Sequence, residues 1–503
     1  MRSLNELWCQ SVERFAGRTA VIYEEQHYTY AELDALLAAF AGHLRQRLGV
    51  RPGDRVALLM PNCLHSLVCY WGAIRAGAVA LPINIRLKPP ELRFILGDGA
   101  PVVAVIHGSV WPAAREALAD LQPPPALVGV ELDAPGVLPV ATLLQPGPEA
   151  PAALAAPDDV AAILYTSGTT GRPKGAMITH GNVLFNVQAT IAGHGFRPDD
   201  VHLVVVPLFH VTGLNTLTPT AFYQGATLVV TARTAPSELL PLIARHRVTT
   251  FFGVPTTMIL LAQTPGIAEH DLTSLRLIAY SGAPMPLRTI ERLRGLFPGV
   301  RLHNFYGLTE TTSVTTVLPD EQALVRPESV GVPPPGLELK VVDAEGNALP
   351  PGAVGELLVR GPSITKGYYN RPDATAEAIT AGWLHTGDAA FLDAEGYVYL
   401  QGRKKELILV AAENVYPVEV ENVLTTHPAV AEAAVVGLPH PILGEVVKAV
   451  VVLRPGASAS EQELKRHCAE RLASYKVPQV VEFRASLPRN PSGKVVKREL
   501  MAE

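Results

Sequence analysis

The sequence predicts an α/β fold, in which a large N-terminal domain of α/β sheets carries a small antiparallel β subdomain and precedes a small α+β C-terminal domain. The 503 residues exceed the size at which one hydrophobic core stops growing, so two or more domains are expected. Hydrophobic residues make up 48% and charged residues 18% of the chain, a balance typical of globular α/β proteins. Short apolar runs also alternate with stretches of helical periodicity.

The apolar runs of the large domain indicate buried strands, because each of them ends abruptly in Gly, Pro, Ser or Thr. Residues 287–296, which lie between two of the runs, have helical periodicity. The alternation predicts a largely parallel sheet, and ligands of such sheets bind beyond the carboxyl ends of the strands. The runs are Ala161–Tyr165, Val201–Val206, Val248–Phe252, Leu275–Tyr280 and Arg301–Phe305.

The pattern changes after Leu337. Segments Val341–Gly346 and Phe391–Gly396 each place a Gly-containing turn between β-type runs, which predicts hairpins of an antiparallel subdomain. The basic cluster Gly402–Lys405 follows the second hairpin. We therefore expect a large domain over residues 1–402 and a small one over residues 403–503.

The last unit has helix and strand signals of its own. Ser460–Glu463 is a capping box that opens a helix running to about Ala473, and Val480–Phe483 is typical of a strand. At the other end of the chain, Leu4, Leu7, Trp8, Val12 and Phe15 have the spacing of an amphipathic helix. That helix is expected to pack on a core and differs from a cleavable signal.

Charge and composition exclude several classes of partner. The formal net charge of -5 leaves no basic surplus for a phosphate backbone, so nucleic acid is not an expected partner. No apolar run is long enough to form an integral membrane segment, and we expect a cytoplasmic protein. The four cysteines suggest neither a disulfide framework nor a zinc site. The sequence is compatible with a homodimer but does not fix the oligomeric state.

The segment Tyr165–Gly175 leaves a strand and concentrates hydroxyls, glycines and one lysine, as a phosphate-binding loop requires. It differs from the P-loop, because Pro173 precedes Lys174 and no Ser or Thr follows. A flexible surface turn is the alternative. The residues expected to bind phosphate are Thr166, Ser167, Gly168, Thr169, Thr170, Gly171 and Lys174.

The order of residues in this loop resembles the signature of the adenylate-forming superfamily: acyl-CoA and aryl-CoA synthetases, adenylation domains of nonribosomal peptide synthetases, and firefly luciferase. The resemblance covers nearly the whole chain, since further motifs follow in the expected order. It implies an AMP-forming acyl-CoA synthetase, similar to fatty-acyl-CoA ligases, that uses ATP, Mg²⁺ and coenzyme A. It also implies that the small domain is hinged to the large one at Lys405.

The resemblance assigns a pocket for the carboxylic acid. In Pro207–Leu214, His210 would lie beside the acyl group, although a lone histidine is more often structural. Apart from His210 the candidate residues are neutral, which favours an apolar fatty or aromatic tail over a dicarboxylate. The candidates are Phe209, His210, Leu214, Tyr280, Ser281, Gly282, Thr311 and Thr312.

Two further motifs are implied to bind the nucleotide base and the metal. In Ser281–Pro286, residues Gly282, Ala283 and Pro284 would lie along the adenine. In Phe305–Glu310, Tyr306 would stack on it beside Gly307, Thr309 would contact the α-phosphate, and Glu310 would hold magnesium. Without the resemblance, Tyr306 would be a core residue and Glu310 a helix-start residue.

The remaining motifs are implied to bind ribose and to stabilise the adenylation step. Asp388 would accept hydrogen bonds from the ribose hydroxyls, with Arg403 nearby. Lys494, in the Pro/Gly-rich loop 487–494, would touch both the carboxylate and the α-phosphate. The implied catalytic residues are Lys494, Thr166, Glu310 and His210.

One position departs from the family pattern. Many relatives have two adjacent glycines in the tunnel for coenzyme A, where this chain has Ala411 and Ala412. Their methyl groups would lie where the thiol arm approaches the backbone. Coenzyme A is the expected acceptor, with a carrier-protein thiol or a luciferase-like oxidation of the adenylate as alternatives. A non-catalytic nucleotide sensor ranks last, because the lysines and carboxylates of the site are retained.

Overall fold

The computed structural model describes residues 1–147, 151–166, 173–282, 285–410, 413–441, 443–490 and 493–501. By its internal contacts the chain divides into two compact units. Unit 1 comprises Met1–Glu338 and Val359–Leu384, and unit 2 comprises Leu339–Leu358 and His385–Glu503. Unit 2 thus includes both expected hairpins as well as the C-terminal residues. The sequence also predicted a small mobile domain over residues 403–503. That domain boundary stays a prediction.

The first sheet of unit 1 is parallel except for its last pair, β8 and β9, which run antiparallel. This pair flanks the expected phosphate loop. Along the sheet the order is β7 (Val137–Pro139), β6 (Ala126–Val130), β5 (Val103–His107), β3 (Arg55–Leu59), β4 (Val79–Pro82), β8 (Val160–Thr166) and β9 (Lys174–Thr179).

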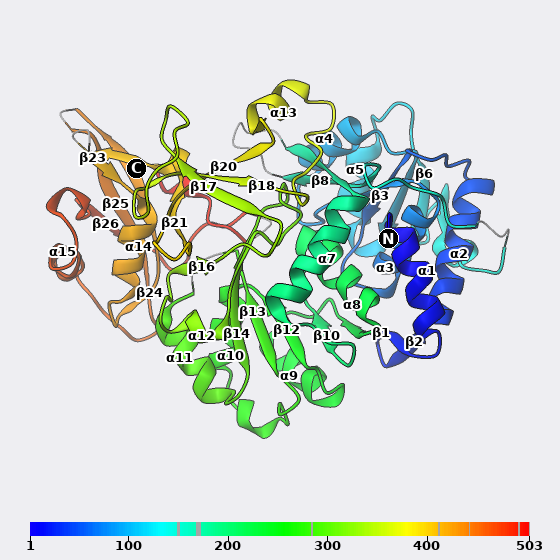
Figure 1. Ribbon diagram of the computed structural model, residues 1–503, viewed down its shortest axis with the longest axis horizontal. Coiled ribbons are helices and arrows are strands. Elements are labelled where there is room, and N and C mark those ends of the chain that lie inside the picture. The colour runs from blue at the N-terminus through cyan, green and yellow to red at the C-terminus, as the bar shows by residue number, and fades with distance from the viewer. Residues whose placement is uncertain are drawn as a thin grey trace. The chain divides into compact units, whose positions relative to one another are not determined.

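The second sheet of unit 1 has parallel central strands, visible in green in Figure 1. The expected strands correspond to β8, β10, β12, β13 and β14, so the predicted α/β class is confirmed. Along the sheet the order is β15 (Thr316–Leu318), β14 (Arg301–Tyr306), β13 (Leu277–Tyr280), β12 (Thr250–Gly253), β10 (Val201–Val204), β11 (Thr227–Val230), β1 (Thr19–Tyr23) and β2 (Gln26–Thr29).

Helices cover both sheets because their apolar stripes need a partner. Helices α9 (Pro236–Arg245), α10 (Pro255–Gln263) and α11 (Leu287–Leu296) pack on one face of the second sheet. Helices α7 (His180–His194) and α8 (Thr218–Gln224) share a core with residues of both sheets. Helix α1 (Leu4–Phe15) joins this core, as its spacing predicted. None of the helices in the described ranges has the length and apolar character needed to cross a bilayer.

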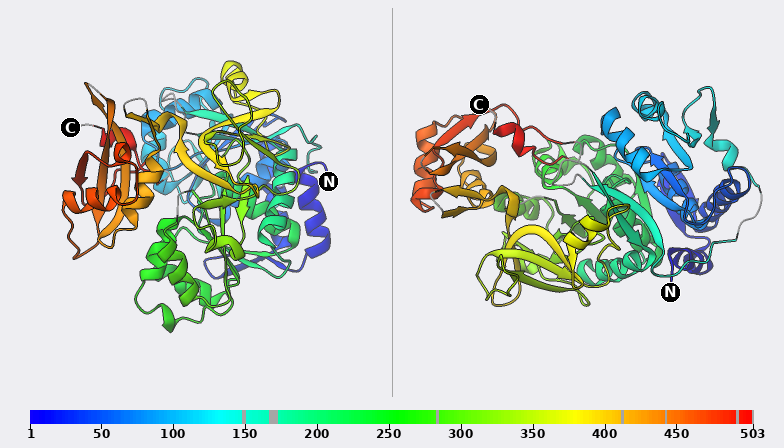
Figure 2. Two further views of the ribbon diagram at one scale, coloured as in Figure 1. Left: turned by 60° about the vertical axis from the view of Figure 1, so that its left-hand side comes forward. Right: turned by 90° about the horizontal axis from the view of Figure 1, so that it is seen from above.

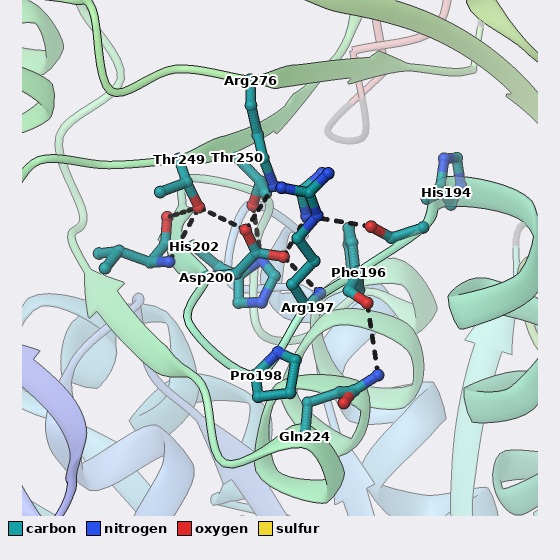
Figure 3. A network of polar contacts seen from close by, with 12 residues as sticks. His194, Phe196, Arg197, Pro198, Asp200, His202, Gln224, Thr249, Thr250 and Arg276 are labelled. Carbon is teal, nitrogen blue, oxygen red and sulfur yellow. Dashed lines mark hydrogen bonds and ion pairs between the residues drawn. The ribbon is translucent and has the colours of Figure 1, made fainter.

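A buried polar network braces the second sheet at the amino ends of its parallel strands. Figure 3 shows the carboxylate of Asp200, just before β10, accepting hydrogen bonds from Arg276 and Thr249, which precede β13 and β12. The backbone N–H of Arg197 also donates to this carboxylate, at 2.7 Å. Because the carboxylate is paired and fully hydrogen-bonded, its burial is tolerated. The opposite, carboxyl ends of the strands hold Tyr280 and Tyr306.

Unit 2 contains the expected antiparallel subdomain. Its strands β21 (Val398–Arg403), β20 (Trp383–Leu392), β18 (Gly355–Arg360) and β17 (Glu338–Val342) are neighbours in that order. The predicted turn between β20 and β21 is present, with Gly396 at φ +85°, and so is the turn that follows β17. Glycine suits the first of these turns because a side chain is strained at that φ value.

The C-terminal sheet of unit 2 has different partners on its two faces. Helices α14 (Pro417–Thr425) and α15 (Glu461–Ala469) pack on one face of this sheet, which is drawn in orange and red in Figure 2. Leu487 and Leu500 pack on the other face. The capping box at Ser460 is confirmed, although α15 ends at Ala469. The sheet order is β23 (Glu413–Val415), β22 (Ile408–Val410), β25 (Gly444–Leu453) and β24 (Val430–His440), with β26 (Val480–Phe483) paired to β25.

Candidate active site

The two ends of the expected phosphate loop lie side by side. Thr166 ends β8, Lys174 begins β9, and the two residues are paired across the antiparallel ladder. Both ends of the loop therefore lie at the carboxyl end of β8, where ligands of such sheets bind. The residues of the loop itself, Ser167, Gly168, Thr169, Thr170 and Gly171, fall outside the described residues, as do Ala283, Pro284, Ala411 and Ala412.

The structure brings Glu310 to this point. Its Oε1 atom accepts a hydrogen bond from the Thr166 hydroxyl at 3.3 Å and from the Tyr368 hydroxyl at 2.9 Å. The Lys174 ammonium lies over the Tyr368 ring, 5.1 Å from its centre. Three predicted residues, Thr166, Lys174 and Glu310, are therefore clustered around a tyrosine that sequence reasoning missed.

Tyr368 comes from a segment that lies beside β9 and is joined to it by one isolated β-bridge, between Tyr368 and Ala176. The Met177 N–H donates to the Gly367 carbonyl at 2.9 Å, and the Met177 carbonyl accepts from the Lys366 N–H at 3.0 Å. The Tyr369 N–H donates to the Gly175 carbonyl at 2.8 Å. Gly367 has a φ of +127°, and a Cβ there would lie 2.5 Å from the Thr375 methyl group. This requirement for glycine just before the tyrosine is the sequence signal that could have drawn attention to Tyr368.

The turn after β14 positions Tyr306 and Glu310. The Leu308 N–H donates to the Thr311 hydroxyl at 2.8 Å, and the Thr312 hydroxyl donates to the Ser363 carbonyl at 2.7 Å. Both threonines, which were expected in the acid pocket, are fully buried and use their hydroxyls to hold the turn. Gly307 is required by close packing, since a Cβ there would lie 1.1 Å from the Ser313 carbonyl oxygen. Thr309 is half-buried in the same turn.

Two of the segments expected to line the acid pocket are in contact. The hydroxyls of Thr212 and Ser313 lie 3.2 Å apart, and both residues are buried. Thr212 begins a π-helix over Thr212–Leu217, a form that occurs frequently at functional sites. Within it Leu214 is buried, whereas His210 just before it is exposed and Phe209 is half-buried.

Asn62 supports the turn that precedes His210 and was not predicted. Its side-chain oxygen Oδ1 accepts a hydrogen bond from the Leu208 N–H at 2.7 Å, and its side-chain nitrogen Nδ2 donates to the Val206 carbonyl at 3.0 Å. A buried asparagine side chain that satisfies the backbone hydrogen-bonding groups of a turn in this way fixes the position of the turn. No pattern in the sequence distinguishes it from other turn asparagines.

The third pocket segment begins at the carboxyl end of β13. Tyr280 is fully buried, and burial raises the pKa of its phenol. Ser281 donates its N–H to the Gly253 carbonyl at 3.3 Å, and Gly282 is exposed at φ +90°. These residues therefore lie at the strand end where a ligand is expected, with Tyr280 forming part of the core beneath it.

Unit 2 holds the predicted ribose residues and Lys494. Arg403 Nε lies 2.9 Å from Asp388 Oδ1, and another guanidinium nitrogen donates to the Thr386 carbonyl at 2.9 Å. Lys494 is exposed on a hairpin closed by Asn490, whose side chain accepts from the Lys494 N–H at 2.9 Å. Lys405 is exposed in the 3₁₀ helix η4 (Lys404–Glu406).

The donor set around Glu310 fits one kind of metal site. No group of three or more His, Cys, Asp or Glu side chains that could hold a metal ion occurs in the part of the chain that the structure describes. Mg²⁺ is commonly held by one or two carboxylates together with substrate phosphates, without an all-protein cage. A single carboxylate beside a phosphate loop is consistent with that arrangement.

Two family models match the chain in succession. The model described as AMP-binding enzyme matches residues 8–369, and the model described as AMP-binding enzyme C-terminal domain matches residues 419–494. The chain belongs to the AMP-binding enzyme family.

Relatives of this AMP-binding enzyme cover nearly its whole length. Feruloyl-CoA synthase from Amycolatopsis sp. is 40% identical over 483 residues, 96% of this chain and 95% of the relative. The fatty acid–[acyl-carrier-protein] ligase ScoC from Streptomyces coeruleorubidus is 37% identical over 489 residues, 96% and 92% of the two chains. Among solved structures, the crystal structure of the anthranilate CoA ligase AuaEII in complex with anthranoyl-AMP matches with a TM-score of 0.92 and 30% sequence identity. The match covers 99% of this chain and 96% of that chain.

These similarities confirm the expected fold and enzyme class. The chain is an adenylating enzyme of the AMP-forming acid–thiol ligase class, in the acyl-CoA synthetase family, with the α/β, antiparallel and C-terminal parts of that family. The named relatives differ from one another in the acid and in the thiol acceptor.

Proposed function

We propose that this AMP-binding enzyme joins an apolar carboxylic acid, aromatic or fatty, to ATP as an acyl-adenylate, and then transfers the acyl group to coenzyme A. Pyrophosphate leaves in the first step and AMP in the second. The observation that carries the proposal is the cluster of Thr166, Lys174 and Glu310 at the two ends of the phosphate loop. It supplies a hydroxyl, a cation and a carboxylate at one point.

In the first step a carboxylate oxygen attacks the α-phosphorus of ATP. Lys174 and the loop donate to the phosphate oxygens, and Thr309 contacts the α-phosphate. Glu310 and Thr166 would hold Mg²⁺, which when bound neutralises charge on the leaving pyrophosphate. Lys494 approaches the carboxylate and the α-phosphate, where its positive charge neutralises negative charge as the bond forms.

In this proposal the nucleoside is bound through both its base and its ribose. Tyr306 stacks on adenine, which also lies along Gly282 and the two residues that follow it. Asp388 accepts from the ribose hydroxyls while Arg403 holds its carboxylate in place. Rotation of residues 403–503 about Lys405 would exchange Lys494 for the thiol between the two steps.

The acid is assigned from the chemistry of the pocket segments. Residues 209–214, 280–282 and 311–314 contain no Arg or Lys that could pair with a second carboxylate. A buried carboxylate without a counter-charge is strongly disfavoured, so a dicarboxylic acid is a poor substrate. The similarity to a feruloyl-CoA synthase and to a fatty acid ligase supports an apolar acid.

A carrier-protein thiol is the second candidate acceptor. It is favoured by Ala411 and Ala412, which stand where many relatives have glycines, and by the similarity to ScoC. Coenzyme A is preferred because the feruloyl-CoA synthase has the higher identity of the two.

The test is pyrophosphate release against ferulate, benzoate, palmitate and malonate, each with and without coenzyme A or a phosphopantetheinylated carrier protein. We expect sustained turnover with an aromatic or fatty acid only when coenzyme A is present. Sustained turnover only with the carrier protein would show that the acceptor is a carrier-protein thiol and not coenzyme A. Malonate as the best acid would overturn the assignment of the substrate, and oxygen uptake with a single-turnover burst would favour the luciferase-like alternative.

A further inference from the structure

We propose that Tyr368 is a positioning residue that orients the Glu310 carboxylate toward magnesium. The proposal rests on the assignment of Glu310 to the metal in the proposed function. Tyr368 would hold Oε1 of Glu310 through its hydroxyl and leave Oε2 to the ion.

The hydrogen bonds of Glu310 are unequally divided between its two oxygens. Oε1 accepts from both Tyr368, at 2.9 Å, and Thr166, at 3.3 Å. Oε2 accepts no hydrogen bond from any residue in the described ranges. A hydrogen bond from a phenol to a carboxylate is charge-assisted and fixes the orientation of the carboxylate. The arrangement leaves one oxygen with unused acceptor capacity beside the phosphate loop.

The segment that carries Tyr368 also holds the backbone of Glu310. The Thr365 N–H donates to the Glu310 carbonyl oxygen at 2.8 Å. Tyr368 is itself fixed by its N–H, which donates to the Thr375 hydroxyl at 2.8 Å, and by its bridge to Ala176 on β9. Glu310 is therefore held at two points by one segment, as a preorganised ligand should be.

Tyr368 also keeps a cation and an anion apart. Lys174 lies over the ring, and no ion pair links it to Glu310 among the residues that the structure describes. A direct ion pair would occupy a carboxylate oxygen that the metal needs and draw the ammonium away from phosphate. One tyrosine offers a hydroxyl to the carboxylate and a π face to the ammonium, so both charges stay available for ligands.

The test is the affinity of Mn²⁺, a spectroscopic substitute for Mg²⁺, for the protein–ATP complex, measured by electron paramagnetic resonance without an acid substrate. Tyr368→Phe keeps the ring and removes the hydroxyl. We expect the Mn²⁺ dissociation constant to rise about 5- to 10-fold, as loss of one hydrogen bond of about 1 to 1.4 kcal/mol gives. ATP affinity without metal should change less than about twofold, since the ring remains over Lys174.

Tyr369→Phe is the matched control. It makes the same chemical change at the next residue, whose side chain is not in hydrogen-bond contact with Glu310, and it should leave Mn²⁺ affinity unchanged. An equal loss of affinity in both variants would mean that the segment is merely loosened, and the positioning role would be rejected. Thermal melts of the two variants check that both are folded.

Glu310→Gln separates failure of this inference from failure of the proposed function. If Glu310→Gln bound Mn²⁺ as tightly as the wild type, Glu310 would not be a metal ligand. That result would overturn both the role of Tyr368 and the metal assignment in the proposed function. Weak binding in Glu310→Gln with normal binding in Tyr368→Phe would overturn the role of Tyr368 alone. If Tyr368 acts through Glu310, adding Tyr368→Phe to Glu310→Gln should produce no further loss.

Discussion

Arg403 and Asp388 face each other across β20 and β21, with the guanidinium Nε 2.9 Å from the carboxylate Oδ1. The antiparallel register pairs the two residues directly, and the Asp388 side chain is only 10% exposed. The carboxylate is thus held in one orientation before any ligand arrives.

We expect Asp388→Ala to weaken ATP binding about 10- to 100-fold, because it removes an ionised acceptor and leaves the Arg403 guanidinium without its carboxylate. Equilibrium binding of a fluorescent ATP analogue measures the effect. Glu395→Ala, in the exposed turn between the same strands, is the control. Undiminished binding by Asp388→Ala would remove Asp388 from the ribose site.

Lys494→Ala should separate the two half-reactions. We expect the rate of adenylate formation to fall about 10²- to 10³-fold, as loss of one electrostatic donor in a transition state does. Transfer from a synthetic acyl-adenylate to coenzyme A should remain within about threefold. Arg498→Ala removes another exposed cation four residues away and should slow neither step. Equal slowing of both steps by Lys494→Ala would contradict a role confined to adenylation.

Asp200→Asn should destabilise unit 1 without altering the site. Burial alone would raise the pKa of Asp200, but its polar partners together, with the hydrogen bond from Arg276 the largest contribution, hold the pKa below its ordinary value. Stability from this pair is present above the unfolded pKa and is lost as pH falls through the folded pKa. We expect a loss of about 2 to 4 kcal/mol at pH 7 in urea unfolding. A variant with wild-type stability would show that the network contributes little.

Acid should destabilise the protein through buried histidines. Burial lowers the pKa of His180, His202 and His303 to about 4. The unfolded chain binds protons near pH 6.5 and the folded chain near pH 4, so stability is full above pH 6.5 and falls as pH decreases between these values. The slope is about 1.4 kcal/mol per pH unit for each histidine.

Urea unfolding at pH 7, 6 and 5 measures the slope for the wild type and for His303→Gln, which does not titrate. The variant should lose less stability between pH 7 and pH 5 than the wild type does, even if its stability at pH 7 is lower. Equal losses in the two proteins would show that His303 does not contribute to the acid sensitivity.

Local sequence patterns were sufficient for the elements of the fold. The apolar runs of the second sheet correspond to β10, β12, β13 and β14 because strands buried on both faces need continuous apolar side chains. The capping box at Ser460 starts α15 because a serine and a glutamate three residues later satisfy the first N–H groups of a helix. The end of α15, which has no such signal, was expected four residues later than it occurs.

The sequence by itself determined the alternation of strands and helices, the phosphate loop with its lysine, and the order of the motifs that place the chain among adenylating enzymes. Each of these is written in residues close together in the chain, where spacing controls backbone geometry. Only the tertiary structure decided that Thr166 and Tyr368 share one oxygen of Glu310, and that Thr311 and Thr312 hold a turn with their hydroxyls. These contacts join residues up to 144 positions apart, and their geometry depends on how the strands and turns pack.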